Sequence, residues 1–131
     1  MLTDYIAANR LRARVIDSAA MGELIKCDIF SRSDSFFMTV RFANDKINSE
    51  KLAASMGPEI QKINGSRIET ITGYKEKFLP PISVFGLKVL VDSKIMKKPI
   101  VSCVVGEDKV LEISPNEILE ANKEASIKEL T

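Results

Sequence analysis

Hydrophobic and polar residues alternate along the middle of the chain in the manner of β-strands. Between residues 36 and 42 every second side chain is apolar, whereas Thr39 and Arg41 point to the opposite face, as in a strand buried on one side. Residues 23–31 form a similar run, and the polar stretch 32–35 between them has the length of a hairpin turn. We therefore predict an antiparallel strand pair.

Further strands and short helices are predicted on both sides of this pair. Runs rich in β-branched residues predict five more strands, at 13–17, 59–63, 87–92, 100–105 and 109–113. Helices are expected at 2–11, 49–56 and 64–72 and from Pro115 onward. Asn48 or Ser49 caps the second helix and Gly57 ends it, while Ser114 caps the last. These elements predict an α+β fold, with a mixed, mostly antiparallel β-sheet of six to seven strands and helices packed around it.

The connection from residue 71 to residue 86 is long and has no periodicity of its own. A long ordered loop in a compact domain is usually functional. The Pro80-Pro81 step makes its second half extended and stiff, because each ring fixes φ and restricts the preceding residue. Two interpretations stay open here, a stiff surface loop and one wall of a binding cleft.

Composition narrows the chemistry available to the chain. Its 131 residues suit a single domain, placed at 1–131, and 19 basic against 18 acidic residues leave a net charge of +1. Contact with nucleic acid would therefore need a local basic patch. The chain has no histidine, which excludes imidazole acid–base catalysis, Ser-His or Cys-His nucleophiles and nearly all zinc sites. We expect no metal and no cofactor.

The cysteines and the apolar runs indicate the cellular setting. Cys27 and Cys103 lie in strand-like runs and form no CxxC motif, so buried free thiols are expected. The apolar runs are too short to span a bilayer, and the first residues include Asp4 and no apolar segment typical of a secretory signal. We expect a cytoplasmic protein without a membrane partner.

Three residues are candidates for a site, each with an ordinary alternative. Lys26 shares a strand face with Asp28, so it is either one half of a weak, solvated ion pair or a cation held on a rigid strand to bind a phosphate or carboxyl group. Gly106 either provides a positive φ for a hairpin or lets a ligand approach the backbone. Asp92, at a strand end, either begins a turn or takes part in catalysis.

Taken together, these residues resemble the YbaK/prolyl-tRNA-editing-domain family. The resemblance spans residues 23–119 and consists of a strand Lys in ELIKCDIF, the turn ITGY after a helix, a Pro-containing loop, the strand VLVD, the turn VVG and the helix start EISPNEIL. It implies an aminoacyl-tRNA deacylase, freestanding or part of a synthetase, that hydrolyses the ester of a mischarged tRNA, tRNA-Pro first. Such an editing site is needed because the synthetic site of a synthetase distinguishes amino acids that differ by one methylene group only about 10- to 200-fold.

The resemblance also implies roles for individual residues. Lys26 would be the essential Lys that places the terminal phosphate of the tRNA, while a ribose hydroxyl of the tRNA helps to activate water. Lys75 and Lys77 would lie near the single-stranded acceptor end. The residues implied to bind substrate are Thr72, Gly73, Pro81, Asp92 and Gly106.

Two departures from the family pattern leave an alternative open. Lys77 and Phe78 replace glycines usual in the family's loop, and their side chains would narrow the pocket to a smaller amino acid or abolish the reaction. The segment 17–23 is shorter than in typical members, so one side of the pocket is expected to be open or completed by a homodimer partner. The alternative is a non-catalytic relative that binds a tRNA end, a nucleotide or a protein. An aminoacyl-tRNA synthetase is a further candidate partner.

Overall fold

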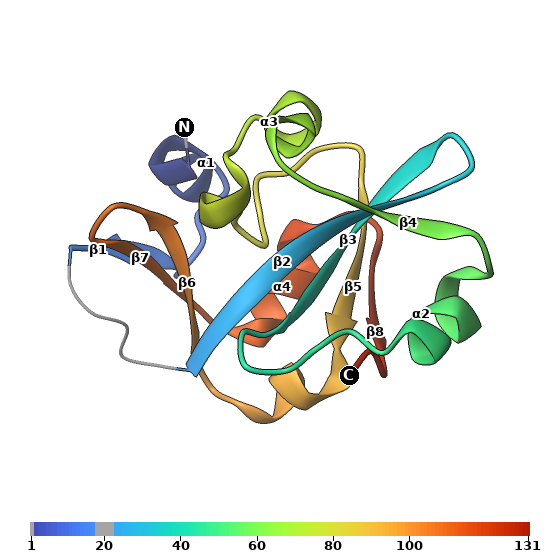
Figure 1. The fold of residues 1–131 in the computed structure, drawn as a ribbon. Helices are drawn as coiled ribbons and strands as arrows, with labels where there is room; N and C mark the ends of the chain where they lie inside the picture. Colours follow the sequence, from blue (N-terminus) through green and yellow to red (C-terminus); the bar gives the residue numbers. More distant parts are fainter. Residues whose placement is uncertain (1, 18–22) are drawn as a thin grey trace.

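The computed structural model describes residues 2–17 and 23–131. Residues 18–22, in the short segment noted above, lie outside the described residues. The elements follow one another as α1 (Leu2–Ala8), β1 (Arg14–Ile16), β2 (Glu23–Arg32), β3 (Ser35–Phe42), α2 (Ser49–Met56), β4 (Ile60–Ile63), α3 (Ser66–Thr72), the 3-10 helix η1 (Glu76–Phe78), β5 (Lys88–Asp92), the 3-10 helix η2 (Ser93–Lys97), β6 (Val101–Gly106), β7 (Lys109–Ile113), α4 (Pro115–Ala121) and β8 (Ala125–Lys128) (Figure 1).

The strands form one curled sheet in the order β1-β7-β6-β2-β3-β5-β8, with β4 paired to β2 beside this path. The pairs β1-β7, β2-β3, β2-β4 and β6-β7 are antiparallel, and β2-β6, β3-β5 and β5-β8 are parallel. The predicted α+β class, with a mixed and mostly antiparallel sheet, is confirmed. β8 is a further strand that was not predicted. Two of its four residues are half-buried and two are exposed, and they show too little alternation to indicate a strand.

Both faces of β3 are buried, although its alternation predicts burial on one face only. Met38 packs in the main core, while Phe37 and Thr39, on the opposite face, are 2% and 0% exposed. Helix α2 and the end of the chain cover this second face through Leu52 and Leu130. Because Thr39 is polar, the sequence pattern gives no indication that this face of β3 is covered.

Helices α2 and α4 begin at predicted capping residues and α3 ends at one, whereas α1 ends at Ala8 and α3 begins at Ser66, inside their predicted ranges 2–11 and 64–72. The Asn48 side chain accepts a hydrogen bond from the Glu50 N–H at 3.0 Å, and Ser114 Oγ accepts one from the Glu117 N–H at 3.3 Å. Gly73 ends α3 in the left-handed conformation, with φ of 82°. Within the described ranges no helix has the length and apolar character that crossing a membrane requires.

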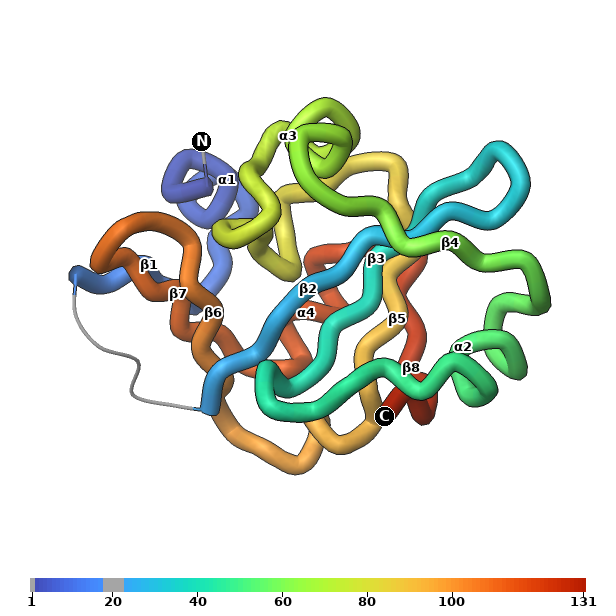
Figure 2. The backbone as a smooth tube through the Cα atoms, in the orientation of Figure 1, coloured from blue at the N-terminus to red at the C-terminus, as the bar shows by residue number. Residues whose placement is uncertain are grey.

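The loop between α3 and β5 leads from α3 through η1 and back to β5 (Figure 2). Its first part contains η1, and its second part, residues 79–84, is buried. Leu79 is 3% exposed and Ile82 is 0% exposed. The Pro80-Pro81 step therefore belongs to the core, and the interpretation of this half as a surface loop is wrong.

A break in the pairing of β2 creates the space in which a site can form. One edge of β2 pairs with β3. The other edge pairs with β6 at Glu23 and Leu24 and with β4 from Ile29 onward. Among the described strands, none pairs with residues 25–28 on that edge. The segment around η1 approaches β2 there instead.

Candidate functional site

Lys26 projects from the stretch of β2 that has no strand partner on one edge. Its side chain is exposed, and within residues 2–17 and 23–131 its ammonium forms no hydrogen bond or ion pair. The neighbouring Ile25 and Cys27 point the other way, into the main core. A cation on a strand anchored in this way is well placed to hold an anionic group.

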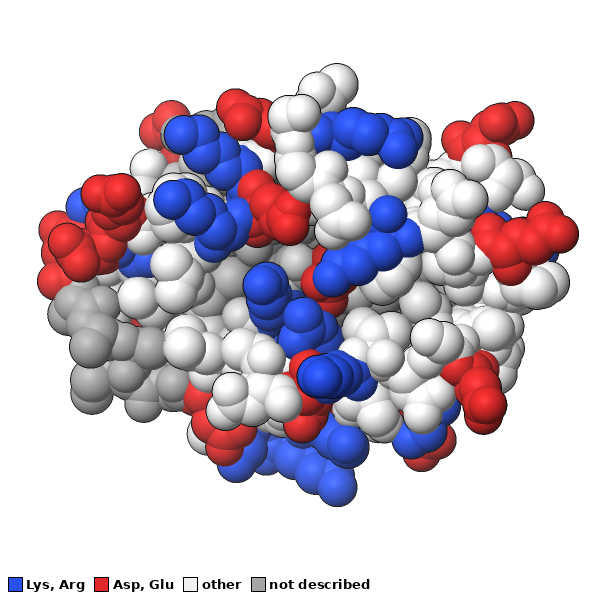
Figure 3. Space-filling view, in the orientation of Figure 1, with Lys and Arg blue, Asp and Glu red and all other residues white. Residues whose placement is uncertain are grey.

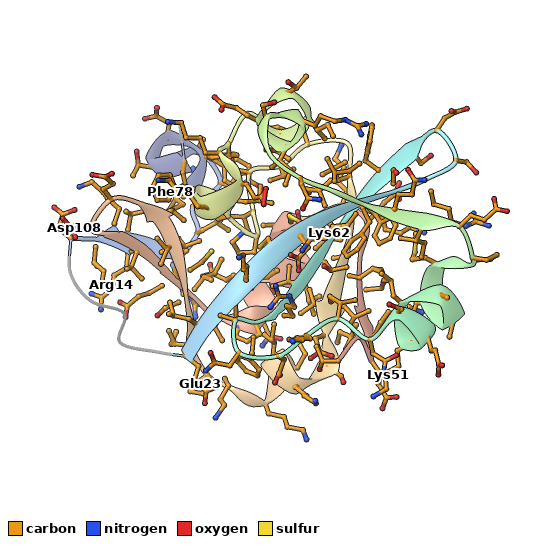
Figure 4. All side chains as sticks on the ribbon, in the orientation of Figure 1. Arg14, Glu23, Lys51, Lys62, Phe78 and Asp108 are labelled. Atoms are coloured by element: carbon orange, nitrogen blue, oxygen red, sulfur yellow. The ribbon has the colours of Figure 1, made fainter. Side chains whose placement is uncertain are left out.

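A hollow of about 320 Å³, here called the inner hollow, lies beside Lys26 where β2, η1 and β6 meet. Its lining residues are Leu24, Ile25, Lys26, Cys27, Ala43, Glu76, Lys77, Phe78, Leu79, Cys103 and Val104. Most of this lining is apolar. The half-buried Phe78 side chain, labelled in Figure 4, forms part of the wall without filling the space.

A second hollow of about 450 Å³, the outer hollow, shares Lys26 with the inner one and extends to the start of α3. Lys75 and Lys77 line it as well, together with Glu69 and Glu76. The Glu76 carboxylate accepts a hydrogen bond of 2.7 Å from the Gly65 N–H, just before α3. Figure 3 shows basic side chains gathered on the face of the molecule crossed by β2.

Two hydroxyl groups hold the turn that precedes η1. Thr72 Oγ1 donates to the Ile68 carbonyl at 2.8 Å and accepts from the Tyr74 N–H at 3.1 Å. The Tyr74 hydroxyl donates to Ser83 Oγ at 2.8 Å. Burial raises the pKa of Tyr74, so this phenol stays neutral and keeps its role as a donor.

The buried half of the loop is held by α4 and β6. Asn122 Nδ2, at the end of α4, donates to the Pro81 carbonyl at 3.0 Å. Cys103 Sγ donates to the Leu79 carbonyl at 3.4 Å. Both cysteines are buried free thiols, as predicted. Burial, and next a hydrogen bond with Cys103, raises the pKa of Cys27 well above its ordinary value, so the Cys27 thiol beside the inner hollow remains uncharged.

Of the residues that the resemblance assigns to catalysis or substrate binding, Lys26 lines both hollows, and the other five lie outside their described lining. Thr72 and Gly73 stand just before the lining segment 75–79. Pro81 lies just after it and is buried. These three residues shape the segment through its backbone.

Asp92 and Gly106 lie in other parts of the fold. Asp92 is 1% exposed and accepts a hydrogen bond of 3.1 Å from the Leu130 N–H, so it holds the end of the chain against β5. Gly106 is not among the described glycines with positive φ, and Asp108 takes that conformation instead, with φ of 54°. A Cβ at Gly106 would lie 3.2 Å from the Lys109 side chain. Close packing within the hairpin therefore explains this glycine.

The sequence of the chain matches a known protein family. The sequence model of the aminoacyl-tRNA editing domain matches residues 14–121, which is most of the chain. The chain belongs to the aminoacyl-tRNA editing domain family. Comparison of this editing domain with curated protein sequences finds no match.

Solved structures share the fold of this editing domain at low sequence identity. A structure described as a candidate trans-editing enzyme for prolyl tRNA synthetase superimposes with a TM-score of 0.86 at 14% identity, over 99% of this chain and 94% of that one. Hypothetical protein APE2540 gives 0.86 at 18%, over 98% and 97%. A scaffold from work on epitope backbone grafting by computational design gives 0.87 at 15%, over 99% and 94%. At such identities the similarity shows a common fold.

The editing domain pairs its charges differently from the sequence-based prediction. Asp28 does not pair with Lys26 but accepts a hydrogen bond from Arg41 Nε, with 2.7 Å between Nε and Oδ2. In the strand register Arg41 is opposite Lys26 and reaches Asp28 diagonally. Lys62 Nζ, from β4, lies 3.6 Å from Asp28 Oδ1. The interpretation of Lys26 as half of a weak ion pair is therefore wrong.

The apolar lining of the inner hollow could not be assigned from sequence. Leu79 and Cys103 come from separate elements and meet only in the folded editing domain. The one available signal was the apolar pair Phe78-Leu79 inside a polar loop. Among the described residues there is also no cluster of three His, Cys, Asp or Glu side chains that could hold a metal ion.

Proposed function

We propose that the chain is a freestanding, cytoplasmic trans-editing aminoacyl-tRNA deacylase that hydrolyses the ester of a mischarged tRNA, with tRNA-Pro-type substrates first. The observation that carries the proposal is the Lys26 ammonium, which has no partner among the described residues and lies in the wall of a mostly apolar hollow, in a chain of the editing domain family. A cation next to an apolar space suits a terminal nucleotide that carries a small aminoacyl group.

The reaction assigned to this site needs no imidazole. Lys26 holds the terminal phosphate and thereby directs the aminoacyl group into the inner hollow. Water, activated with the help of a ribose hydroxyl, adds to the ester carbonyl, and the bond to the ribose oxygen breaks. The products are a free amino acid and an intact tRNA. Lys75 and Lys77, which line the outer hollow, supply charge for phosphates nearer the acceptor stem.

The other residues implied by the resemblance receive different parts in this proposal. Thr72, Gly73 and Pro81 position the lining segment and do not touch the substrate. Asp92 and Gly106 have structural roles in β5 and in the β6–β7 hairpin. Among the residues predicted to be catalytic or to bind substrate, Lys26 is the one to which we assign direct contact with substrate.

A second candidate function is binding of a tRNA end, a nucleotide or a protein without turnover. The observation that favours it is Phe78, which lies in the wall of the inner hollow at a position where the family usually has glycine. The Lys77 ammonium lies 5.1 Å from the centre of the Phe78 ring, an arrangement that holds the ring in place.

A deacylation screen tests the proposal. The purified chain should release amino acid from alanyl-, cysteinyl- or seryl-tRNA-Pro, and Lys26→Ala should lower kcat/KM about 10- to 100-fold through loss of one charged contact. Lys88→Ala is the matched control, since Lys88 is an exposed strand lysine outside both hollows. Binding of tRNA without release of amino acid at high protein concentration would favour the second candidate. Activity that survives Lys26→Ala would refute the assigned site.

A further inference from the structure

A third and larger hollow, of about 680 Å³, lies between β2, β3, β4 and α2. We call it the α2 hollow. Its apolar lining is formed by Phe30, Ile47, Leu52 and Ile60, which belong to the smaller core cluster or pack against it. Nothing in the reaction proposed above uses this space.

The α2 hollow adjoins the Lys26 site along one face of β2. Asp28, which lines the α2 hollow, follows Lys26 on the same face, about 7 Å further along the strand. Arg41, another lining residue, is the cross-strand partner of Lys26. A ligand that leaves Lys26 along the strand therefore enters the α2 hollow directly. The separation is comparable to one nucleotide of an extended strand.

Two cations of the α2 hollow are available for a ligand. The Arg41 guanidinium is occupied by Asp28 and by backbone carbonyls, the closest at 2.7 Å. Lys46 is exposed and has no ion pair within the described part of the chain. Lys62 is 52% exposed, and its one ion pair among the described residues is the 3.6 Å contact with Asp28. Figure 4 places Lys62 near the middle of β2, and Figure 3 shows basic side chains continuing across this face.

Exposed lysines beside an apolar surface are the combination that binds single-stranded nucleic acid. Lysines contact the phosphates, and an unstacked base covers the apolar surface. A peptide or a lipid is a less suitable occupant, because neither is covalently joined to the terminal nucleotide that Lys26 holds.

We propose that the α2 hollow binds the nucleotide that precedes the terminal adenosine of the tRNA acceptor end. Its base lies on the surface formed by Phe30, Ile47 and Ile60, and Lys46 and Lys62 bind the adjacent phosphate. This subsite rests on the proposed function, since the terminal nucleotide is the one held at Lys26. It explains how a chain with a net charge of only +1 could select an acceptor end by a local patch.

Kinetics with two substrates test the subsite. The double variant Lys46→Ala, Lys62→Ala should raise KM for alanyl-tRNA-Pro about tenfold, equivalent to about 1.4 kcal/mol, and leave kcat unchanged. Its KM for 3′-O-alanyl-adenosine, which has no preceding nucleotide, should not change. Lys123→Ala is the control, because Lys123 is an exposed lysine that lines a different hollow beside α1. An unaltered KM for the tRNA, or equal changes for both substrates, would overturn the subsite.

A binding measurement keeps the subsite testable if the chain proves to have no deacylase activity. The labelled ribotrinucleotide CCA should bind more tightly than adenosine alone, and the same trinucleotide with an abasic middle position should bind about tenfold more weakly, since base stacking contributes on this scale. The double lysine variant should lose the preference for CCA. Equal binding of CCA and its abasic form would show that the α2 hollow holds no base.

Discussion

Arg41 stands directly opposite Lys26 in the β2–β3 register, but its guanidinium turns along the strand to bind the Asp28 carboxylate. The same guanidinium donates to the carbonyls of Ala43 and Asp45, at 3.3 and 2.7 Å. The Arg41 guanidinium is thereby fully engaged within the fold, whereas the Lys26 ammonium is exposed and has no partner among the described residues. Of these two neighbouring cations, Lys26 is therefore the one that the fold leaves exposed.

The first prediction concerns the Asp28–Arg41 pair. Arg41→Met should lower the free energy of unfolding by about 3 kcal/mol, because Asp28 is 4% exposed and would keep a buried charge. The value lies at the low end of the usual range because Lys62, 3.6 Å away, replaces part of the lost attraction. The double variant Asp28→Leu, Arg41→Met should regain much of the loss. Urea denaturation measures both, and equal losses in the two variants would contradict the prediction.

The second prediction concerns the turn before η1. Thr72→Val keeps the side-chain shape but removes the acceptor of the Tyr74 N–H and the bond to Ile68. Unfolding free energy should fall by about 1 to 2 kcal/mol. The control is Thr70→Val, since Thr70 is exposed and has one bond of 3.3 Å to a helix carbonyl, and its effect should stay below about 0.5 kcal/mol. Similar losses in thermal or urea unfolding would show that the Thr72 network does not stabilise the turn.

The third prediction is a loss of stability at alkaline pH that arises from Cys27. Burial raises the pKa of this thiol in the folded state. Above about pH 8.5 the unfolded chain releases the proton while the folded chain retains it, so stability falls with rising pH, with a limiting slope of about 1.4 kcal/mol per pH unit. Between pH 8 and 9.5 the unfolding free energy of Cys27→Ala should decline less steeply than that of the parent. Parallel curves would rule out a protonated thiol at this position.

The fourth prediction concerns the size of the accepted amino acid. Phe78→Ala should enlarge the inner hollow and raise kcat/KM for prolyl-tRNA-Pro relative to alanyl-tRNA-Pro by about tenfold or more, the scale of discrimination given by small differences in side-chain volume. Phe85→Ala is the matched control, because Phe85 is 76% exposed and its ring contacts Tyr5 away from this hollow. A ratio that stays constant in Phe78→Ala would show that Phe78 does not limit the substrate.

Local features of the sequence were enough to predict most elements of the fold. The caps at Asn48 and Ser114 act within one helical turn, and the positive φ of Gly73 depends on its own missing side chain. The hairpin of β2 and β3 follows from alternation and from the length of the turn between them. Such signals act over a few residues, so their outcome does not depend on the rest of the chain.

The tertiary structure alone decided which of these elements form a site. The inner hollow exists because β4 and β6 part from β2 on either side of Lys26, and Pro81 is buried because α4 and β6 hold its segment from outside the loop. Likewise, Asp28 pairs with Arg41 and not with Lys26 because of the register of β2 and β3. Contacts of this kind join residues far apart along the chain, and neither the alternation of residues nor the composition predicts them.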